Sequence, residues 1–189
     1  EGKRASYYPM IRIGLDVLLF AVLISYYPLK SLLTWWLPKY ADSLIYMSIL
    51  FPSCVFLSKQ SLLINTYLKS MRKEALMLKI NSISVLVSAI TTFISVEIFH
   101  DLNLTILSIV GVYAFQCCLS ELLVGYLLGL KILKDIVSDL LMCSVFIISG
   151  WFVESIWCMA IYSGAYVVFI IIYKKKIKEL LKISREHGV

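Results

Sequence analysis

Six apolar stretches, separated by short polar junctions, make up most of this 189-residue chain. They cover residues 10–36, 41–69, 78–99, 102–130, 136–153 and 155–173. A helix of about 20 apolar residues crosses the hydrocarbon core of a bilayer, where every backbone polar group must be hydrogen-bonded within its own segment. The fifth stretch is the weakest candidate, because Asp135 and Asp139 lie in its first turns. No strand-like alternation recurs, so we predict an all-α polytopic membrane protein, a bundle of six transmembrane helices.

Basic residues gather at every second junction between these stretches. Lys and Arg cluster before the first stretch, between the second and third, between the fourth and fifth, and after the sixth. The other junctions hold only Lys39, with Lys30 just before it, or no basic residue. Because Lys and Arg remain on the cytoplasmic side of a membrane, the alternation predicts that both ends of this segment are cytoplasmic.

The composition agrees with a membrane protein. Hydrophobic residues make up 60% of the chain and charged residues 16%, with a mean hydropathy of +0.87. Soluble domains hold about 45–50% apolar and about 25% charged residues. The net charge of +6 follows from the membrane topology, so no nucleic-acid partner is predicted.

Motifs for metal binding or catalysis are missing from the sequence. The five cysteines lie within apolar stretches at no spacing typical of a metal site. His100 stands beside Asp101 at a junction and His187 lies in the tail, and neither has a nucleophile at a recognisable spacing. We therefore predict no cofactor, no metal and no enzymatic activity.

Four consecutive polar residues, Ser58 to Ser61, interrupt the second stretch near its middle. An ammonium at this depth costs at least about 2.5 kcal/mol on insertion scales. We expect Lys59 to face a water-filled cavity or a partner, with snorkelling to the inner headgroups as the alternative. The cavity is favoured, because snorkelling does not account for Gln60 and Asn65.

Two further sites place charge inside the stretches. Arg12 and Asp16 stand four residues apart, so they share a helix face and can pair, either structurally or at the inner mouth of a substrate path. Glu121 lies in line with Gly125 and Gly129, a spacing of small residues that lets helices approach closely. It is predicted to pair with a cation of a neighbouring helix, in preference to serving as a proton or cation site.

Three other features have structural interpretations. A polar stripe along the third stretch predicts close packing against another helix; its residues are Asn81, Ser84, Ser88, Thr92 and Ser95. Pro28 and Pro52 each remove a backbone hydrogen bond and predict kinks in the first two spans. Residues 174–189 form a lysine-rich segment with apolar residues at helical spacing, which predicts a basic amphipathic tail on the inner leaflet.

Several segments between residues 36 and 81 resemble a known family. They are Trp36-Leu37-Pro38-Lys39-Tyr40-Ala41-Asp42-Ser43, Ile49-Leu50-Phe51-Pro52, Ser58-Lys59, Asn65-Thr66-Tyr67-Leu68-Lys69, Arg72-Lys73-Glu74 and Lys79-Ile80-Asn81, with Ser120-Glu121 further on. Together they resemble bacterial polysaccharide flippases, the exporters of lipid-linked O-antigen and capsule oligosaccharides in the multidrug/oligosaccharidyl-lipid/polysaccharide superfamily.

The resemblance implies two six-helix lobes around a central cavity in the bacterial inner membrane. This chain would be the second lobe, and its missing N-terminal lobe would precede it in a longer protein. The substrate would be an undecaprenyl-pyrophosphate-linked oligosaccharide. Lys59 would attract the pyrophosphate, Gln60 and Asn65 would hydrogen-bond polar groups, and Arg12 and Asp16 would line the cavity.

Two alternatives remain open at the level of sequence. A cation-coupled multidrug antiporter of the same superfamily would need an embedded acid as its ion site, which Asp16 or Glu121 could provide. A membrane enzyme or non-transporting subunit would need catalytic groups at a membrane face, where His100 and Asp101 are the candidates.

Overall fold

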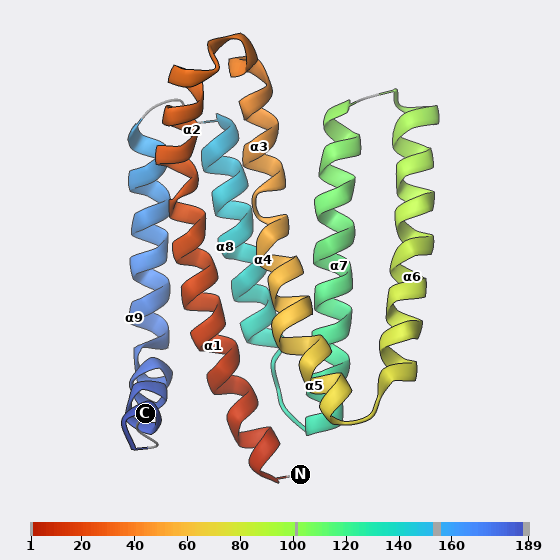
Figure 1. Cartoon of the computed structure of the whole chain (residues 1–189), viewed down its shortest axis with the longest axis vertical. Coiled ribbons are helices and arrows are strands. Elements are labelled where there is room, and N and C mark those ends of the chain that lie inside the picture. Colours follow the sequence, from red (N-terminus) through yellow and green to blue (C-terminus); the bar gives the residue numbers. More distant parts are fainter. Residues whose placement is uncertain (1, 101, 153–155, 187–189) are drawn as a thin grey trace.

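The computed structural model describes residues 2–100, 102–152 and 156–186, and every regular element within these ranges is helical. Successive passes run antiparallel through the bundle (Figure 1). The first pass is α1 (Gly2–Ile24) and α2 (Tyr26–Trp36), followed by a turn at η1 (Pro38–Ser43). The return pass has four parts: α3 (Leu44–Leu50), α4 (Ser53–Ser58), η2 (Lys59–Ile64) and α5 (Asn65–Ser70). The remaining elements are α6 (Glu74–Phe93), η3 (Ile94–Ile98), α7 (Leu102–Leu128), α8 (Leu133–Phe152) and α9 (Ile156–Glu186).

Five helical segments among the described residues are long and apolar enough to cross a membrane. They are Tyr7–Trp36, Tyr46–Ser70, Glu74–Ile98, Asn103–Leu128 and Trp157–Lys178. The predicted fifth span corresponds to α8, which is not among the five and carries Lys134, Asp135 and Asp139 in its first two turns. The fold is therefore that of an all-helical membrane protein.

The start of α1 and the end of α9 lie at the same end of the bundle, as do the α5–α6 and α7–α8 connections (Figure 1). These are the regions that carry most of the basic residues. We call this end of the bundle the basic end. Lys30 and Lys39 belong to α2 and η1, which lie at the opposite end.

Both predicted kinks coincide with interruptions in the helices. Pro28 has no N–H to donate to the carbonyl of Ile24, and α1 ends at that residue. Pro52 falls between α3 and α4. The first two passes are therefore built from segments rather than from continuous rods.

An aromatic core joins the passes at the end of the bundle opposite the basic end. The ring of Phe146 in α8 lies 5.2 Å from the rings of both Tyr26 and Tyr162, each in an edge-to-face arrangement. All three side chains are fully buried. Aromatic pairs of this geometry stabilise beyond their buried area, so they fix α2, α8 and α9 against one another.

Two glycines expected to support helix contact serve the turn after α7 instead. Gly129 adopts φ +67°, and the N–H of Leu130 donates to the carbonyl of Gly125 at 2.9 Å. This backbone geometry ends a helix and favours glycine. A Cβ at Gly125 would lie 2.5 Å from Ile132 Cδ1. Both glycines thus shape the connection into α8.

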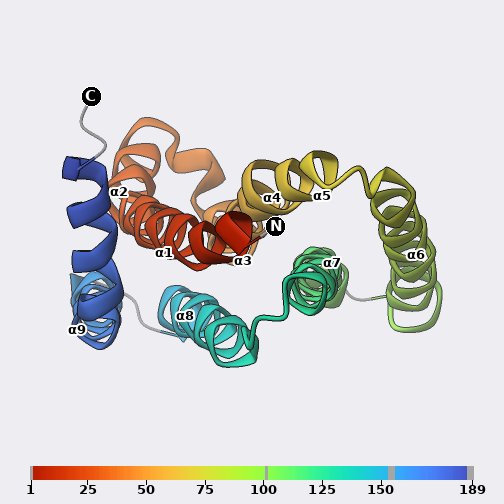
Figure 2. The same ribbon diagram turned by 90° about the horizontal axis from the view of Figure 1, so that it is seen from below.

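The predicted tail continues the last span without a break. α9 extends to Glu186, and its final turns run at an angle to its earlier part (Figure 2). The terminal residues 187–189 of the predicted tail, including His187, lie outside the described residues.

Candidate functional site

Five charged side chains meet inside the bundle, and each is at most 4% exposed. They are Arg12 and Asp16 of α1, Lys59 at the start of η2, Glu121 of α7 and Asp139 of α8. We call this group the charge cluster. Charged groups inside membrane-spanning bundles are costly and face the interior or a cavity, where they pair with one another.

The guanidinium of Arg12 contacts all three acids. Nη1 donates to Asp16 Oδ2 at 2.9 Å, Nε donates to Glu121 Oε1, and Nη2 donates to Asp139 Oδ2. A guanidinium carries five N–H donors in a rigid plane, which allows one side chain to serve several carboxylates. Arg12 therefore ties α1 to both α7 and α8.

The ammonium of Lys59 reaches the same three carboxylates from the other pass. Lys59 Nζ lies 3.0 Å from Asp16 Oδ1 and 3.6 Å from Glu121 Oε1, and it donates to Asp139 Oδ2. The two cations and three acids thus form one network that spans four elements.

Local backbone structure positions these side chains. Lys59 is the first residue of η2, a π-helical segment in the middle of the second pass. Such segments are rare in helices and are frequent at functional sites. Asp139 stands six residues after Leu133, the start of α8, and Glu121 stands seven residues before Leu128, the end of α7; both of these helix ends lie at the basic end. At about 1.5 Å per residue, both lie at the same depth, roughly 10 Å from that end.

The charges of the cluster do not balance. Two cations face three carboxylates, so the cluster carries one surplus negative charge when every group is ionised. Asp139 Oδ1 has no hydrogen-bond partner in the described part of the chain. Uptake of one proton or one monovalent cation would neutralise the group. Alternatively, a bound anion could take over the cations from the carboxylates.

Gln60 and Asn65 form a pair of their own. Gln60 Nε2 donates to Asn65 Oδ1 at 3.3 Å. The side-chain oxygen of Gln60, Oε1, has no hydrogen-bond partner among the described residues. Gln60 follows Lys59 directly and Asn65 stands six residues after Lys59, yet the hydrogen bond between the two amides joins neither of them to the carboxylates. Their expected contact with a substrate stays a prediction.

The pairings predicted from the sequence are present. Arg12 pairs with Asp16, and the cation that pairs with Glu121 from another helix is Arg12. The Lys59 side chain is 1% exposed and bonded to acids, so it has the partner geometry rather than the snorkelling geometry. The water-filled cavity favoured for Lys59 stays a prediction. Asp139 was missed because it was interpreted only as a weakness of the fifth stretch. An acid within an apolar run was the signal for it.

No group of His, Cys, Asp and Glu side chains in the described ranges is arranged to hold a metal ion. His100 is exposed and adopts φ +50°, and its neighbour Asp101 lies outside the described residues. The enzyme alternative stays a prediction.

No protein-family model, curated protein or solved structure matches this chain. The resemblance to polysaccharide flippases thus stays a prediction carried by its sequence segments.

Proposed function

We propose that this chain is the second lobe of a flippase that moves undecaprenyl-pyrophosphate-linked oligosaccharide across the bacterial inner membrane. The charge cluster carries the proposal, because ionisable groups buried in membrane-spanning helices mark substrate and ion pathways. The resemblance over residues 36–81 supports the choice of substrate. On this proposal α8 also crosses the membrane, as the fifth of six spans, the basic end faces the cytoplasm, and a first lobe completes the cavity.

The cluster gives this function a mechanism. Pyrophosphate is an anion that forms charge-assisted hydrogen bonds with the same donors as a carboxylate does. In the described conformation Arg12 and Lys59 are both ion-paired with the three carboxylates of the cluster. Pyrophosphate that binds these cations would displace the acids and loosen the contacts among α1, η2, α7 and α8. Substrate binding would then favour a different arrangement of the helices, as alternating access requires.

The segmented passes suit such a rearrangement. The α1–α2 and α3–α4 interruptions accompany Pro28 and Pro52, and η2 begins at Lys59 itself. Transporter sites are typically built from discontinuous helices near the middle of the membrane. A shift of Lys59 could therefore be absorbed within the second pass.

Lys59→Ala in the complete protein tests the proposal. We expect the variant to insert in the membrane but to lose surface polysaccharide, since the pyrophosphate would lose its attracting cation. Lys69→Ala is the matched control, because Lys69 is an exposed lysine on the same pass. Surface polysaccharide is measured on whole cells, and membrane insertion by blotting. Normal polysaccharide with Lys59→Ala would refute the role of this residue.

A reporter that is active only in the periplasm tests the orientation. Fused after Asp101 it should be active, and fused after Lys134, in the α7–α8 region at the basic end, it should be silent. The reverse pattern would place the basic end outside and contradict the proposed topology.

A cation-coupled antiporter is the second candidate, favoured by the surplus carboxylate of the cluster. Glu121→Gln would remove one acid and leave two cations facing two carboxylates. If the protein is an antiporter, this change should abolish drug resistance. If it is the proposed flippase, drug resistance should not depend on the protein at all.

A further inference from the structure

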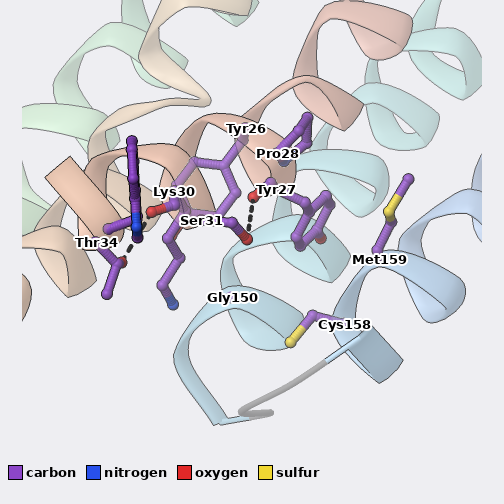
Figure 3. A pocket seen from close by; sticks show the side chains of 10 residues that line it. Tyr26, Tyr27, Pro28, Lys30, Ser31, Thr34, Gly150, Cys158 and Met159 are labelled. Carbon is purple, nitrogen blue, oxygen red and sulfur yellow. Dashed lines mark hydrogen bonds between the residues drawn. The ribbon is translucent and has the colours of Figure 1, made fainter.

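A pocket of about 570 Å³ opens at the end of the bundle opposite the basic end (Figure 3). One wall is α2, and the facing wall consists of Gly150 of α8 with Cys158 and Met159 of α9. Trp35 also lines the pocket and is 82% exposed, so the pocket opens at the surface of the bundle. None of the five cluster residues lines it.

Lys30 supplies the positive charge of this pocket. Its ammonium lies 6.0 Å from the ring centroid of Tyr26, and Figure 3 shows the nitrogen at the free tip of the side chain. No carboxylate of the described ranges forms an ion pair with it. Trp residues concentrate at the headgroup level of a membrane, and Trp35 follows Lys30 by five residues on α2. The cation is therefore placed where lipid phosphates lie.

Two hydroxyls next to Lys30 offer acceptor oxygens. Ser31 Oγ donates to the carbonyl of Tyr27 at 3.2 Å, and Thr34 Oγ1 donates to the carbonyl of Lys30 at 2.8 Å. Both bonds are drawn in Figure 3. Each hydroxyl hydrogen is thus engaged within the helix, and the oxygen lone pairs remain for a ligand. A matching ligand needs an anionic group for Lys30 and hydroxyl donors for Ser31 and Thr34.

The pocket also has an apolar part, made by the Tyr27 ring of α2 together with Cys158 and Met159 of the facing wall. The hydroxyl of Tyr27 lies 3.1 Å from the hydroxyl of Ser149, which anchors the ring beside Cys158 and Met159. The ring and the sulfur-bearing side chains provide a surface for the carbon skeleton of a headgroup. The charge of Lys30, the two hydroxyl acceptors and the apolar part of the pocket together define the ligand chemistry.

We propose that this pocket binds the headgroup of a lipid in which a phosphate ester carries free hydroxyl groups. The phosphate would bond to Lys30, and the hydroxyls would donate to Ser31 and Thr34. Two sources share this chemistry: a phospholipid with a glycerol headgroup, and a sugar attached to a polyprenyl phosphate. The inference does not rest on the proposed flippase activity, because an ordinary phospholipid satisfies it.

Lipid retention by the purified full chain tests the inference. The chain in detergent is incubated with equal amounts of phosphatidylglycerol and phosphatidylcholine, and the lipids that stay bound are counted by native mass spectrometry. We expect phosphatidylglycerol to be preferred. Lys30→Gln should reduce its retention about tenfold, the loss of one charge-assisted hydrogen bond.

Lys39→Gln is the matched control. Lys39 is an exposed lysine at the same end of the bundle and does not line the pocket, so this variant should retain phosphatidylglycerol like the unchanged protein. Thr34→Val keeps the charge and removes an acceptor, and it should lower retention by a smaller factor. If the unchanged protein shows no preference, or if Lys30→Gln and Lys39→Gln behave alike, the site does not exist.

A competition arm identifies the source of the headgroup. A polyprenyl-phosphate-linked sugar that displaces phosphatidylglycerol from the unchanged protein at a lower concentration would make the lipid-linked sugar the ligand. Failure of that lipid to compete would assign the site to phospholipid. In either case lipid retention must depend on Lys30. Retention that is unchanged in Lys30→Gln would overturn the inference.

Discussion

In the interior of the bundle, Arg12 and Lys59 share three carboxylates contributed by α1, α7 and α8, whereas α6 satisfies its polar side chains largely by itself. The hydroxyl of Ser84 donates to the carbonyl of Ile80, one turn earlier in the same helix. One hydrogen bond connects α6 to another helix: Gln116 Nε2 of α7 donates to Asn81 Oδ1 of α6 at 2.9 Å. The polar stripe thus contacts α7 at Asn81.

Position in the bundle accounts for this difference. α6 lies at the edge of the molecule, next to α7 (Figure 2). In the most apolar stretch of Glu74–Ile98 11% is buried, against 50% in that of Tyr46–Ser70. A hydroxyl can use a carbonyl of its own helix, but a buried ion needs an opposite charge from another side chain. Buried charges therefore connect helices to one another, and small hydroxyls leave a helix more independent.

The largest loss of stability should come from removing the guanidinium of Arg12. Arg12→Ala would leave three buried carboxylates without their guanidinium, and we expect a loss of about 3–5 kcal/mol in the free energy of unfolding. SDS titration in mixed micelles measures it. Lys79→Ala, at an exposed lysine of α6, should change the free energy of unfolding by less than about 0.5 kcal/mol. Equal losses in the two variants would remove the contrast between the regions.

A double-mutant cycle sharpens the comparison within the cluster. Lys59→Gln and Asp139→Asn should show a coupling energy of about 0.5–3 kcal/mol, because their charged groups are in contact. The control cycle pairs Lys59→Gln with Asp135→Asn. Asp135 bonds to Lys176, 3.3 Å away, instead of to the cluster, so that coupling should be close to zero. A large coupling in the control would mean that the cluster is not the unit of interaction.

The bond between α6 and α7 should matter less. Gln116→Ala removes the hydrogen bond to Asn81, and interhelical hydrogen bonds in membranes are worth about 0.6 kcal/mol on average and at most about 1.7 kcal/mol. The same titration measures the loss, with Asn81→Ala as the reciprocal change. A loss as great as that of Arg12→Ala would show that α6 is tied to the bundle as strongly as the cluster elements are.

The smallest effect is expected for Ser84→Ala. The hydroxyl serves its own helix, so the free energy of unfolding should change by no more than about 0.5 kcal/mol. A loss well above 1 kcal/mol would indicate that the buried Ser84 side chain makes a contact with another helix on which stability depends.

Part of the cluster could be predicted because it follows from spacing. Arg12 and Asp16 share a face at i and i+4, and an acid as deep as Glu121 needs a cation from a neighbouring helix. The place of Asp139 could not be predicted, because it depends on which helices are neighbours and on the depth at which their side chains meet. The same limit applies to Gln60, whose observed partner is Asn65 rather than a cluster residue.

The sequence by itself determined the helical, membrane-spanning character of this protein, since long apolar stretches in lipid must form their backbone hydrogen bonds internally. It also determined that basic residues occupy every second junction along the chain. Because successive passes are antiparallel, these junctions all lie at one end of the bundle. The tertiary structure decided that Arg12 and Lys59 meet the same three carboxylates. Hydropathy acts locally along the chain, but ion pairing depends on distances between helices, and only packing sets those distances.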